Sequence, residues 1–140
     1  MSRVFWDTNL FIYLFEDYGP LSKTTAALRT KMLARGDQLL TSTLTLGEIL
    51  VKPTEQGDMQ LCSRYEKAIT VAALILPFDA QAARIYASLG SDRALRPPDA
   101  IQLACAAAAG IDLLVTNDAR LQRKQVDGIQ FIVPLERVPM

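Results

Sequence analysis

Short runs of β-forming residues alternate along this chain with longer segments whose apolar residues recur at helical spacing. Because helical segments separate the short runs, the pattern predicts an α/β domain with a mostly parallel sheet and helices on both of its faces. No linker, repeat or low-complexity segment interrupts the pattern, so residues 1–140 are expected to form a single domain. The predicted strands are residues 3–6, 38–42, 74–76, 111–115 and 129–133.

Capping residues, prolines and glycines mark where the helices between the strands begin and end. The first helix is expected to begin at residues 7–9 and to end at residue 15. Pro53 is expected to stop the third helix, and the prolines at positions 97 and 98 to force the start of the sixth. A further short helix is expected after Asp118. The remaining predicted helices are residues 20–35, 43–51, 58–72, 79–89 and 99–109.

The overall composition restricts the possible functions. Half of the residues are apolar, and 15 Lys and Arg balance 15 Asp and Glu. A neutral chain does not coat nucleic acid through bulk charge, so a polyanion would need local basic groups or a metal. No apolar stretch reaches the roughly 20 residues of a membrane span, and the N-terminus lacks the layout of a signal peptide. We therefore expect a cytoplasmic protein without membrane contact.

The chain contains no histidine, and this removes several mechanisms at once. Ser-His-Asp and Cys-His triads are excluded, as is zinc held by histidine. The two cysteines, Cys62 and Cys105, lie on apolar stripes of predicted helices and are expected to be reduced core thiols. Acid–base chemistry must therefore come from carboxylates, Lys, Tyr or a metal-bound water.

Four acids, Asp7, Glu48, Asp99 and Asp118, follow a predicted strand or open a predicted helix. Each also has a local alternative: the three aspartates would stabilise helix N-termini, and Glu48 would form a capping box with Thr45. Strand ends and helix starts lie at the carboxyl edge of a parallel sheet, where α/β proteins bind their ligands. The four acids are therefore expected to converge there.

A group of convergent carboxylates needs compensation for its charge. Two of them about 4 Å apart repel by roughly 4 kcal/mol at an effective dielectric near 20, whereas a helix dipole returns only about 0.3–1 kcal/mol. Either a raised pKa or a bound cation must make up the difference. Oxygen-only ligands favour Mg²⁺ or Mn²⁺ over zinc. Asp79 has the same local signals as the four acids, and we interpret it as a helix cap.

Four segments that contain these acids follow one another across nearly the whole chain: VFWDTN at residues 4–9, TLGE at 45–48, PDAIQLA at 98–104 and VTND at 115–118. Together they resemble the motifs of PIN-domain ribonucleases, with the closest likeness to VapC-type toxins of bacterial toxin–antitoxin pairs. The resemblance implies a three-layer α/β/α fold of about five strands and an Mg²⁺- or Mn²⁺-dependent endoribonuclease acting on single-stranded or looped RNA.

Carried over by position, the resemblance makes Asp7 and Asp99 the principal metal ligands. Asp118 and Glu48 would complete the catalytic acids, with Asp118 as a further ligand, directly or through water. One of these two would accept the proton of the attacking water, and the products would end in a 5′-phosphate and a 3′-hydroxyl. Four neighbouring polar residues would orient the carboxylates or cap helices: Thr8, Asn9, Thr116 and Asn117.

Basic residues flank two of the four acids in the sequence. Arg93 and Arg96 precede the sixth predicted helix, and Arg120, Arg123 and Lys124 follow the fourth strand. They either hold RNA phosphates or are solvated surface charges. Zero net charge predicts few phosphate contacts and a shallow dependence of RNA binding on salt.

The resemblance also implies a small antitoxin protein as partner. Apolar faces on the second to fourth helices would supply its groove or a homodimer contact. Three alternatives stay open: a PIN-family nuclease without an antitoxin, a non-catalytic PIN-like module that binds RNA or protein, and a phosphatase of the haloacid-dehalogenase type. The last needs a second Asp two residues after the first, where this chain has Asn9.

Overall fold

The computed structural model, which describes all 140 residues, contains one parallel sheet built from β1 (Arg3–Trp6), β2 (Gln38–Ser42), β3 (Leu74–Leu76), β4 (Ile111–Val115) and β5 (Ile129–Val133). All five strands have the predicted bounds. Their order is β3-β2-β1-β4-β5, so the chain leaves the central strand β1 toward one edge and later returns to its other side. The carboxyl end of β1 is therefore the topological switch point, where open α/β sheets bind ligands.

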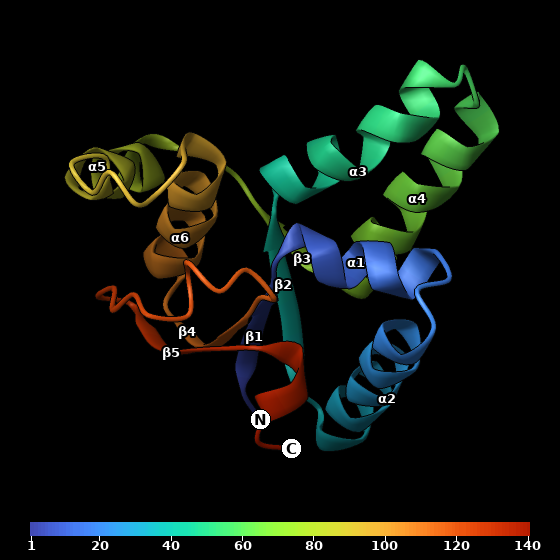
Figure 1. The fold of residues 1–140 in the computed structure, drawn as a ribbon, viewed down its shortest axis with the longest axis horizontal. Helices are drawn as coiled ribbons and strands as arrows, with labels where there is room; N and C mark the ends of the chain where they lie inside the picture. Colours follow the sequence, from blue (N-terminus) through green and yellow to red (C-terminus); the bar gives the residue numbers. More distant parts are fainter.

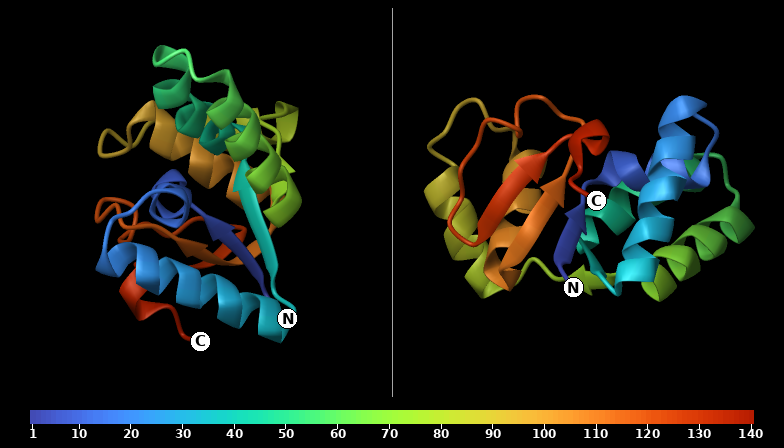
Figure 2. Two further views of the ribbon diagram at one scale, coloured as in Figure 1. Left: turned by 90° about the vertical axis from the view of Figure 1, so that its right-hand side faces the viewer. Right: turned by 90° about the horizontal axis from the view of Figure 1, so that it is seen from below.

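Six helices cover the two faces of this sheet (Figures 1 and 2). One face carries α1 (Thr8–Phe15), α2 (Pro20–Arg35), α3 (Thr43–Glu55) and α4 (Met59–Ala72), and the other carries α5 (Ala80–Leu89) and α6 (Pro97–Ala109). The chain closes with a single 3₁₀ turn, η1 (Leu135–Arg137), which the sequence pattern did not predict. The predicted three-layer α/β/α architecture is confirmed.

The side chains of β1 divide the core into its two halves. Val4 and Trp6 pack with Leu10 and Phe11 on the face covered by α1 to α4. Phe5 points the opposite way, into the cluster that contains Leu103 of α6. Successive residues of a strand face opposite sides of the sheet, so a strand buried on both sides is apolar throughout. This burial fixes the position of Asp7, the first residue after β1.

Two predicted helix boundaries are wrong. α3 does not stop before Pro53 but runs through it to Glu55. Pro53 is buried in the last turn of the helix, where only one backbone hydrogen bond is lost and burial of the ring offsets that loss. α6 begins at Pro97 rather than at Asp99, with prolines in its first turn. Proline is well suited to that position because its missing N–H would have no helical partner.

The helix predicted after Asp118 is also wrong. Residues 119–123 form consecutive turns, in which the Leu121 N–H donates to the Asp118 carbonyl and the Lys124 N–H to the Leu121 carbonyl. The Leu121 side chain is buried in the core. Tertiary packing of this one side chain therefore keeps the segment compact without a helix.

Both cysteines are free thiols. Cys105 is buried, and its burial raises the pKa of the thiol to about 11. Cys62 is half-buried on α4, so only Cys105 is the fully buried core thiol that the sequence predicted. No helix in the structure combines the length and the apolar character that crossing a membrane requires.

Candidate active site

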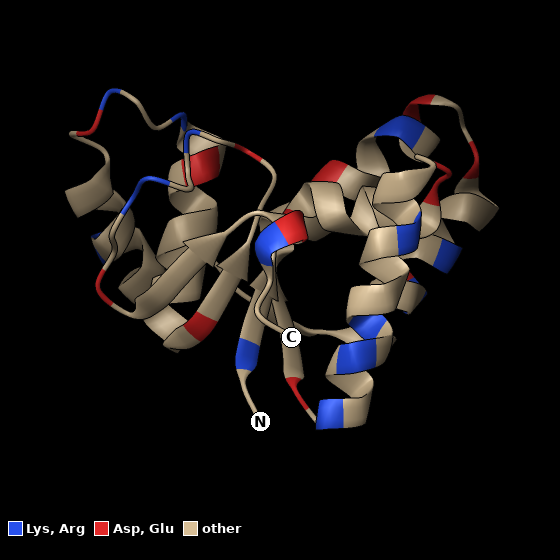
Figure 3. Cartoon of the chain, turned by 60° about the horizontal axis from the view of Figure 1, so that its bottom comes forward, with Lys and Arg blue, Asp and Glu red and all other residues tan.

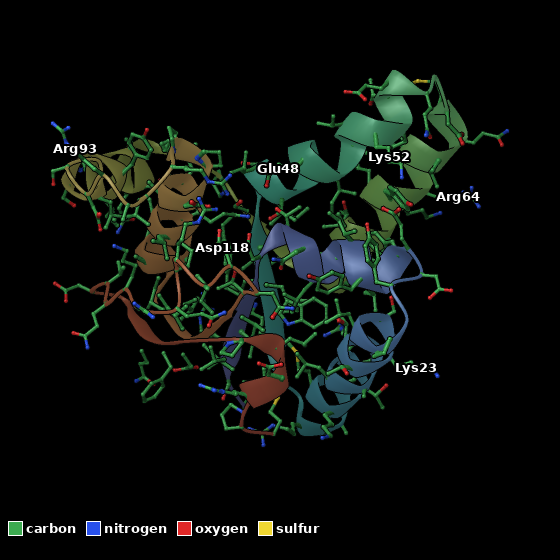
Figure 4. The ribbon with its side chains drawn as sticks, in the orientation of Figure 1. Lys23, Glu48, Lys52, Arg64, Arg93 and Asp118 are labelled. Carbon is green, nitrogen blue, oxygen red and sulfur yellow. The ribbon has the colours of Figure 1, made fainter.

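A pocket of about 240 Å³ opens at the carboxyl edge of the sheet. The four acids named from the sequence reach it from four different places: the end of β1, the first half of α3, the first turn of α6 and the loop after β4. Figure 3 shows how acidic and basic positions are distributed over the fold, and Figure 4 labels Glu48 and Asp118. The pocket is lined by Asp7, Thr8, Asn9, Ile12, Glu48, Arg96, Pro98, Asp99, Gln102 and Asp118.

Asp7 lies at the bottom of this arrangement as the N-cap of α1. Its Oδ1 accepts from the Thr8 N–H at 2.8 Å and from Gln102 Nε2 at 3.2 Å, and its Oδ2 accepts from Thr116 Oγ1 at 2.7 Å. Burial raises the pKa of Asp7 above its ordinary value, and the negative charge of Asp99 raises it further, while the three hydrogen bonds oppose both. A nearby cation would offset the burial and the repulsion that raise the pKa of Asp7.

Asp99 is 6% exposed in the first turn of α6. It accepts from the Arg96 backbone N–H at 3.3 Å and from Arg96 Nε at 3.2 Å. Asp99 thus stabilises the N-terminus of its helix, which was the local alternative for this residue in the sequence. The same carboxylate also lines the pocket, and its negative charge raises the pKa of Asp7. Asp99 therefore both stabilises the start of α6 and belongs to the acidic pocket.

Asp118 is held by two arginines. Arg120 donates to it through Nε at 3.0 Å and NH2 at 2.8 Å, and the Arg96 guanidinium lies 3.7 Å away. The hydrogen bond from Arg120 lowers the pKa of Asp118, and the same contact raises the pKa of Arg120. Asp118 therefore loses its proton more readily than an isolated aspartate.

Glu48 does not form the capping box that was its local alternative. The N-cap of α3 is Ser42, whose hydroxyl accepts from the Thr45 N–H at 3.4 Å. Glu48 instead accepts from the Thr8 hydroxyl at 2.6 Å, a contact that joins α3 to the start of α1. It forms no ion pair, which distinguishes it from Asp99 and Asp118.

The residues expected to support the acids divide into two groups. Thr8 and Thr116 contact the acids directly, and Asn9 lines the pocket with a buried Oδ1 that has no hydrogen-bond partner in the protein. Asn117 does not belong with them, because its Oδ1 accepts from the Leu135 N–H at 3.0 Å on the side of α2 and η1. Its contact with Leu135 connects the loop after β4 to the C-terminal turn η1.

The basic residues also fall into two groups, one beside the acids and one away from them. Arg96 lines the pocket and Arg120 pairs with Asp118, so both are beside the acids. Arg93 lies on the exposed loop before α6 and points away from the pocket (Figure 4). Arg123 and Lys124 line a separate, larger cavity of about 580 Å³ between residues 122–127 and β5. That cavity contains none of the four acids.

Two further polar residues, Asp79 and Gln102, differ in whether they contact the acidic pocket. Asp79 caps α5 by accepting from the Ala82 N–H at 3.0 Å and lies outside the pocket, in agreement with its interpretation as a helix cap. Gln102 contacts Asp7 and was not singled out beforehand. The signal was present, because Gln102 is a polar residue in the buried, Ala-rich stripe of α6.

The chemistry of the donors suits a hard divalent cation. The pocket presents carboxylates and the unpaired Asn9 amide oxygen, and no histidine or cysteine. No three acids are arranged closely enough to hold one ion together. The charge of Asp99 raises the pKa of Asp7, while Asp99 and Asp118 are paired with arginines. The acids that could hold a cation are therefore Asp7 and Asp99, and Arg96 contacts the second of them.

Comparison with known proteins identifies a family. The profile of the PIN domain matches residues 4–126, a range that includes all four acids. No curated protein matches the chain by sequence.

Solved structures share the fold at low sequence identity. VapBC2 from Rickettsia felis, bound to a DNA fragment from its promoter, has a chain with a TM-score of 0.73 and 15% identity, covering 94% of this chain and 97% of that one. DNA-bound VapBC from Salmonella typhimurium gives 0.73 and 18%, covering 96% and 99%. FitAcB from Neisseria gonorrhoeae gives 0.73 and 19%, also covering 96% and 99%.

Proposed function

The chain belongs to the PIN domain family, and from that premise we propose that it is a metal-dependent endoribonuclease that hydrolyses single-stranded or looped RNA. The observation that carries the proposal is the pocket at the switch point of the sheet, where acids from four distant segments meet. A structural cap needs one acid at one helix, and it gives no reason for four acids to share a cavity.

Asp7 and Asp99 would hold the cation, Mg²⁺ or Mn²⁺, and Asp118 would complete the site directly or through water. When bound, such an ion lowers the pKa of a water molecule and offsets negative charge on the phosphoryl oxygens. The raised pKa of Asp7 supports this assignment, because a cation would relieve the burial and repulsion that cause the rise.

Glu48 is the residue best suited to accept the proton of the attacking water. It lines the pocket without an arginine partner, and the Thr8 hydroxyl at 2.6 Å fixes its orientation. Asp118 was the other candidate from sequence, but its pKa is lowered by Arg120, which weakens it as a base. The products would carry a 5′-phosphate and a 3′-hydroxyl.

Arg96 and Arg120 would hold RNA phosphates beside the acids. In the structure both are paired with Asp99 or Asp118, so a cation and a phosphate arriving together would exchange these pairs for new ones. Both side chains are about half exposed, at 59% and 47%, and are free to reorient. Arg96 is the one basic residue that lines the pocket and Arg120 pairs with an acid in it, so few phosphate contacts are expected beside the acids.

We further propose that the chain is the toxin of a toxin–antitoxin pair and acts in the cytoplasm. The structural neighbours named above support this, since VapBC from two species are among them. Large apolar side chains are exposed on α2 to α4, where an antitoxin segment or a second copy would bind: Leu33, Val51, Met59 and Val71. The fold alone does not distinguish a toxin from a PIN nuclease without an antitoxin, so an adjacent antitoxin gene and growth arrest on induction are the tests.

The experiment that tests the nuclease proposal uses the purified protein, freed of any co-purifying partner. It is incubated with a panel of structured and unstructured RNAs in Mg²⁺ or Mn²⁺, with EDTA as the control. The proposal predicts cleavage that EDTA abolishes. Absence of cleavage of every RNA would contradict it, and phosphate release from small phosphomonoesters would favour a phosphatase instead.

A further inference from the structure

Gln102 occupies a position where an apolar residue would ordinarily be found. It lies on α6 one turn after Asp99, is 3% exposed, and is surrounded along the helix by buried alanines, Leu103 and Cys105. A buried amide costs free energy unless both of its polar atoms find partners, and a methionine of similar size would need none. The contacts of the Gln102 amide therefore indicate why glutamine is present.

The amide contacts four separate places around the site. Its Nε2 lies 2.7 Å from Thr45 Oγ1, 3.2 Å from Thr8 Oγ1 and 3.2 Å from Asp7 Oδ1. Its Oε1 accepts from the Ser42 hydroxyl. The ends of β1 and β2, the start of α1 and the start of α3 are thus all connected through one side chain.

The orientation of this amide is determined by charge. The reversed orientation would place Oε1 against the Asp7 carboxylate and Nε2 against Ser42, so two acceptors would face each other. The Asp7 carboxylate, which can only accept, therefore selects the orientation, and the Ser42 hydroxyl anchors the amide by donating to Oε1, although Ser42 itself does not line the pocket. Gln102 then presents only N–H groups to the acidic site.

We propose that Gln102 is a positioning residue of the nuclease site proposed above, which fixes Asp7 and Glu48 relative to each other. One Nε2 proton is taken by Thr45 Oγ1 at 2.7 Å, and the other is shared between Thr8 Oγ1 and Asp7 Oδ1, both at 3.2 Å. Because Thr8 Oγ1 accepts from the amide, its own proton is free to donate to Glu48 at 2.6 Å, and Asp7 Oδ1 also accepts from the Thr8 N–H. Oδ2 of Asp7 has the single donor Thr116 and keeps the greater capacity for a cation.

The test compares Gln102→Met with Leu103→Met, its neighbour on the same buried helix that contacts no acid. Mn²⁺ affinity is measured by calorimetry, and kcat and KM are measured on a cleaved RNA. Gln102→Met should weaken Mn²⁺ binding about 10- to 100-fold and lower kcat by a similar factor with KM unchanged, as loss of a group that orients a ligand does. Leu103→Met should leave all three values near those of the wild type.

A second pair of variants tests the hydrogen bonds around Gln102 without altering its amide. Ser42→Ala removes the group that anchors Gln102, and Asp58→Ala removes the equivalent N-cap of α4, away from the pocket. Ser42→Ala should weaken Mn²⁺ binding several-fold, and Asp58→Ala should not. This pair decides the question if Gln102→Met does not fold.

Wild-type Mn²⁺ affinity in folded Gln102→Met, or in Ser42→Ala, would overturn the proposal and make Gln102 a core residue only. A wild-type protein that binds no Mn²⁺ would overturn it as well. A wild-type protein that binds Mn²⁺ but cuts no RNA would contradict the nuclease function alone, because the Mn²⁺ measurements would still decide the role of Gln102.

Discussion

The hydroxyl of Thr116 donates to Oδ2 of Asp7 across 2.7 Å, although the two residues are 109 positions apart in the chain. The contact follows from the sheet: Trp6 of β1 pairs in register with Val115 of β4, so the next residue of each strand meets its counterpart at the carboxyl edge. The polar residues after adjacent parallel strands are thus brought together by strand register, and the site depends on the core beneath it.

Replacing Thr116 with valine should raise the pKa of Asp7 further. The change keeps the shape of the side chain but removes a donor to a carboxylate whose pKa burial already raises. Because Asp7 must lose its proton to hold a cation, the rising limb of the profile of kcat/KM against pH should move to higher pH. RNA cleavage measured across pH 5 to 9 checks this, and an unshifted profile in Thr116→Val would show that the hydroxyl does not act on Asp7.

Asp7→Asn should stabilise the protein in EDTA. The pKa of Asp7 is higher in the folded than in the unfolded chain, so its contribution favours folding only at low pH and is lost as pH rises through the folded value. At pH 7 the wild type bears the free-energy cost of burying the charged Asp7 carboxylate. Asp7→Asn removes this cost and should raise Tm by about 3 °C, or about 1 kcal/mol.

The same thermal-unfolding experiment contains its own control. Well below pH 3.8, the ordinary pKa of an aspartate, the carboxyl is protonated in both states, so the advantage of Asp7→Asn over the wild type should disappear. Added Mn²⁺ should raise the Tm of the wild type, because an ion that binds the folded state stabilises it. It should not raise the Tm of Asp7→Asn, which lacks a carboxylate needed to bind the ion. A variant that is less stable than the wild type at pH 7 in EDTA would mean that Asp7 is chiefly a helix cap.

Arg96→Ala should change metal and RNA binding in opposite directions. Arg96 pairs with Asp99 at 3.2 Å, so its removal frees this acid for a cation, while Asp118 keeps its closer partner Arg120. Mn²⁺ should then bind about two- to five-fold more tightly, the range expected for an exposed ion pair. RNA should bind more weakly by a similar factor, because a phosphate contact is lost. Calorimetry with Mn²⁺ and filter binding with RNA measure the two effects, and Arg93→Ala, on the exposed loop, is the matched control.

The strands and the convergence of the acids could be predicted from sequence because both depend on local patterns. Short β-forming runs define the five strands, and helical segments between them require parallel crossovers, which place the residues after each strand at one edge. Asp79 shares these signals but follows β3, the edge strand, so strand order separates it from Asp7. Strand order is not encoded in the local pattern around either residue.

Features that depend on tertiary contacts could not be predicted in this way. Pro53 continues α3 because its ring is buried there, and the turns after Asp118 replace a helix because Leu121 packs into the core. Asn117 directs its side chain to Leu135 rather than to the acids next to it in sequence. Gln102 contacts residues from four elements, and nothing adjacent to it in the chain indicates those contacts.

The most direct test of the acidic site is RNA cleavage by Asp7→Asn and Asp79→Asn side by side in Mn²⁺. Both aspartates cap a helix after a strand, but only Asp7 lines the pocket. We predict that Asp7→Asn lowers kcat by at least about 100-fold, whereas Asp79→Asn cleaves as the wild type does. Equal cleavage by the two variants would contradict the assignment of the pocket as the catalytic centre.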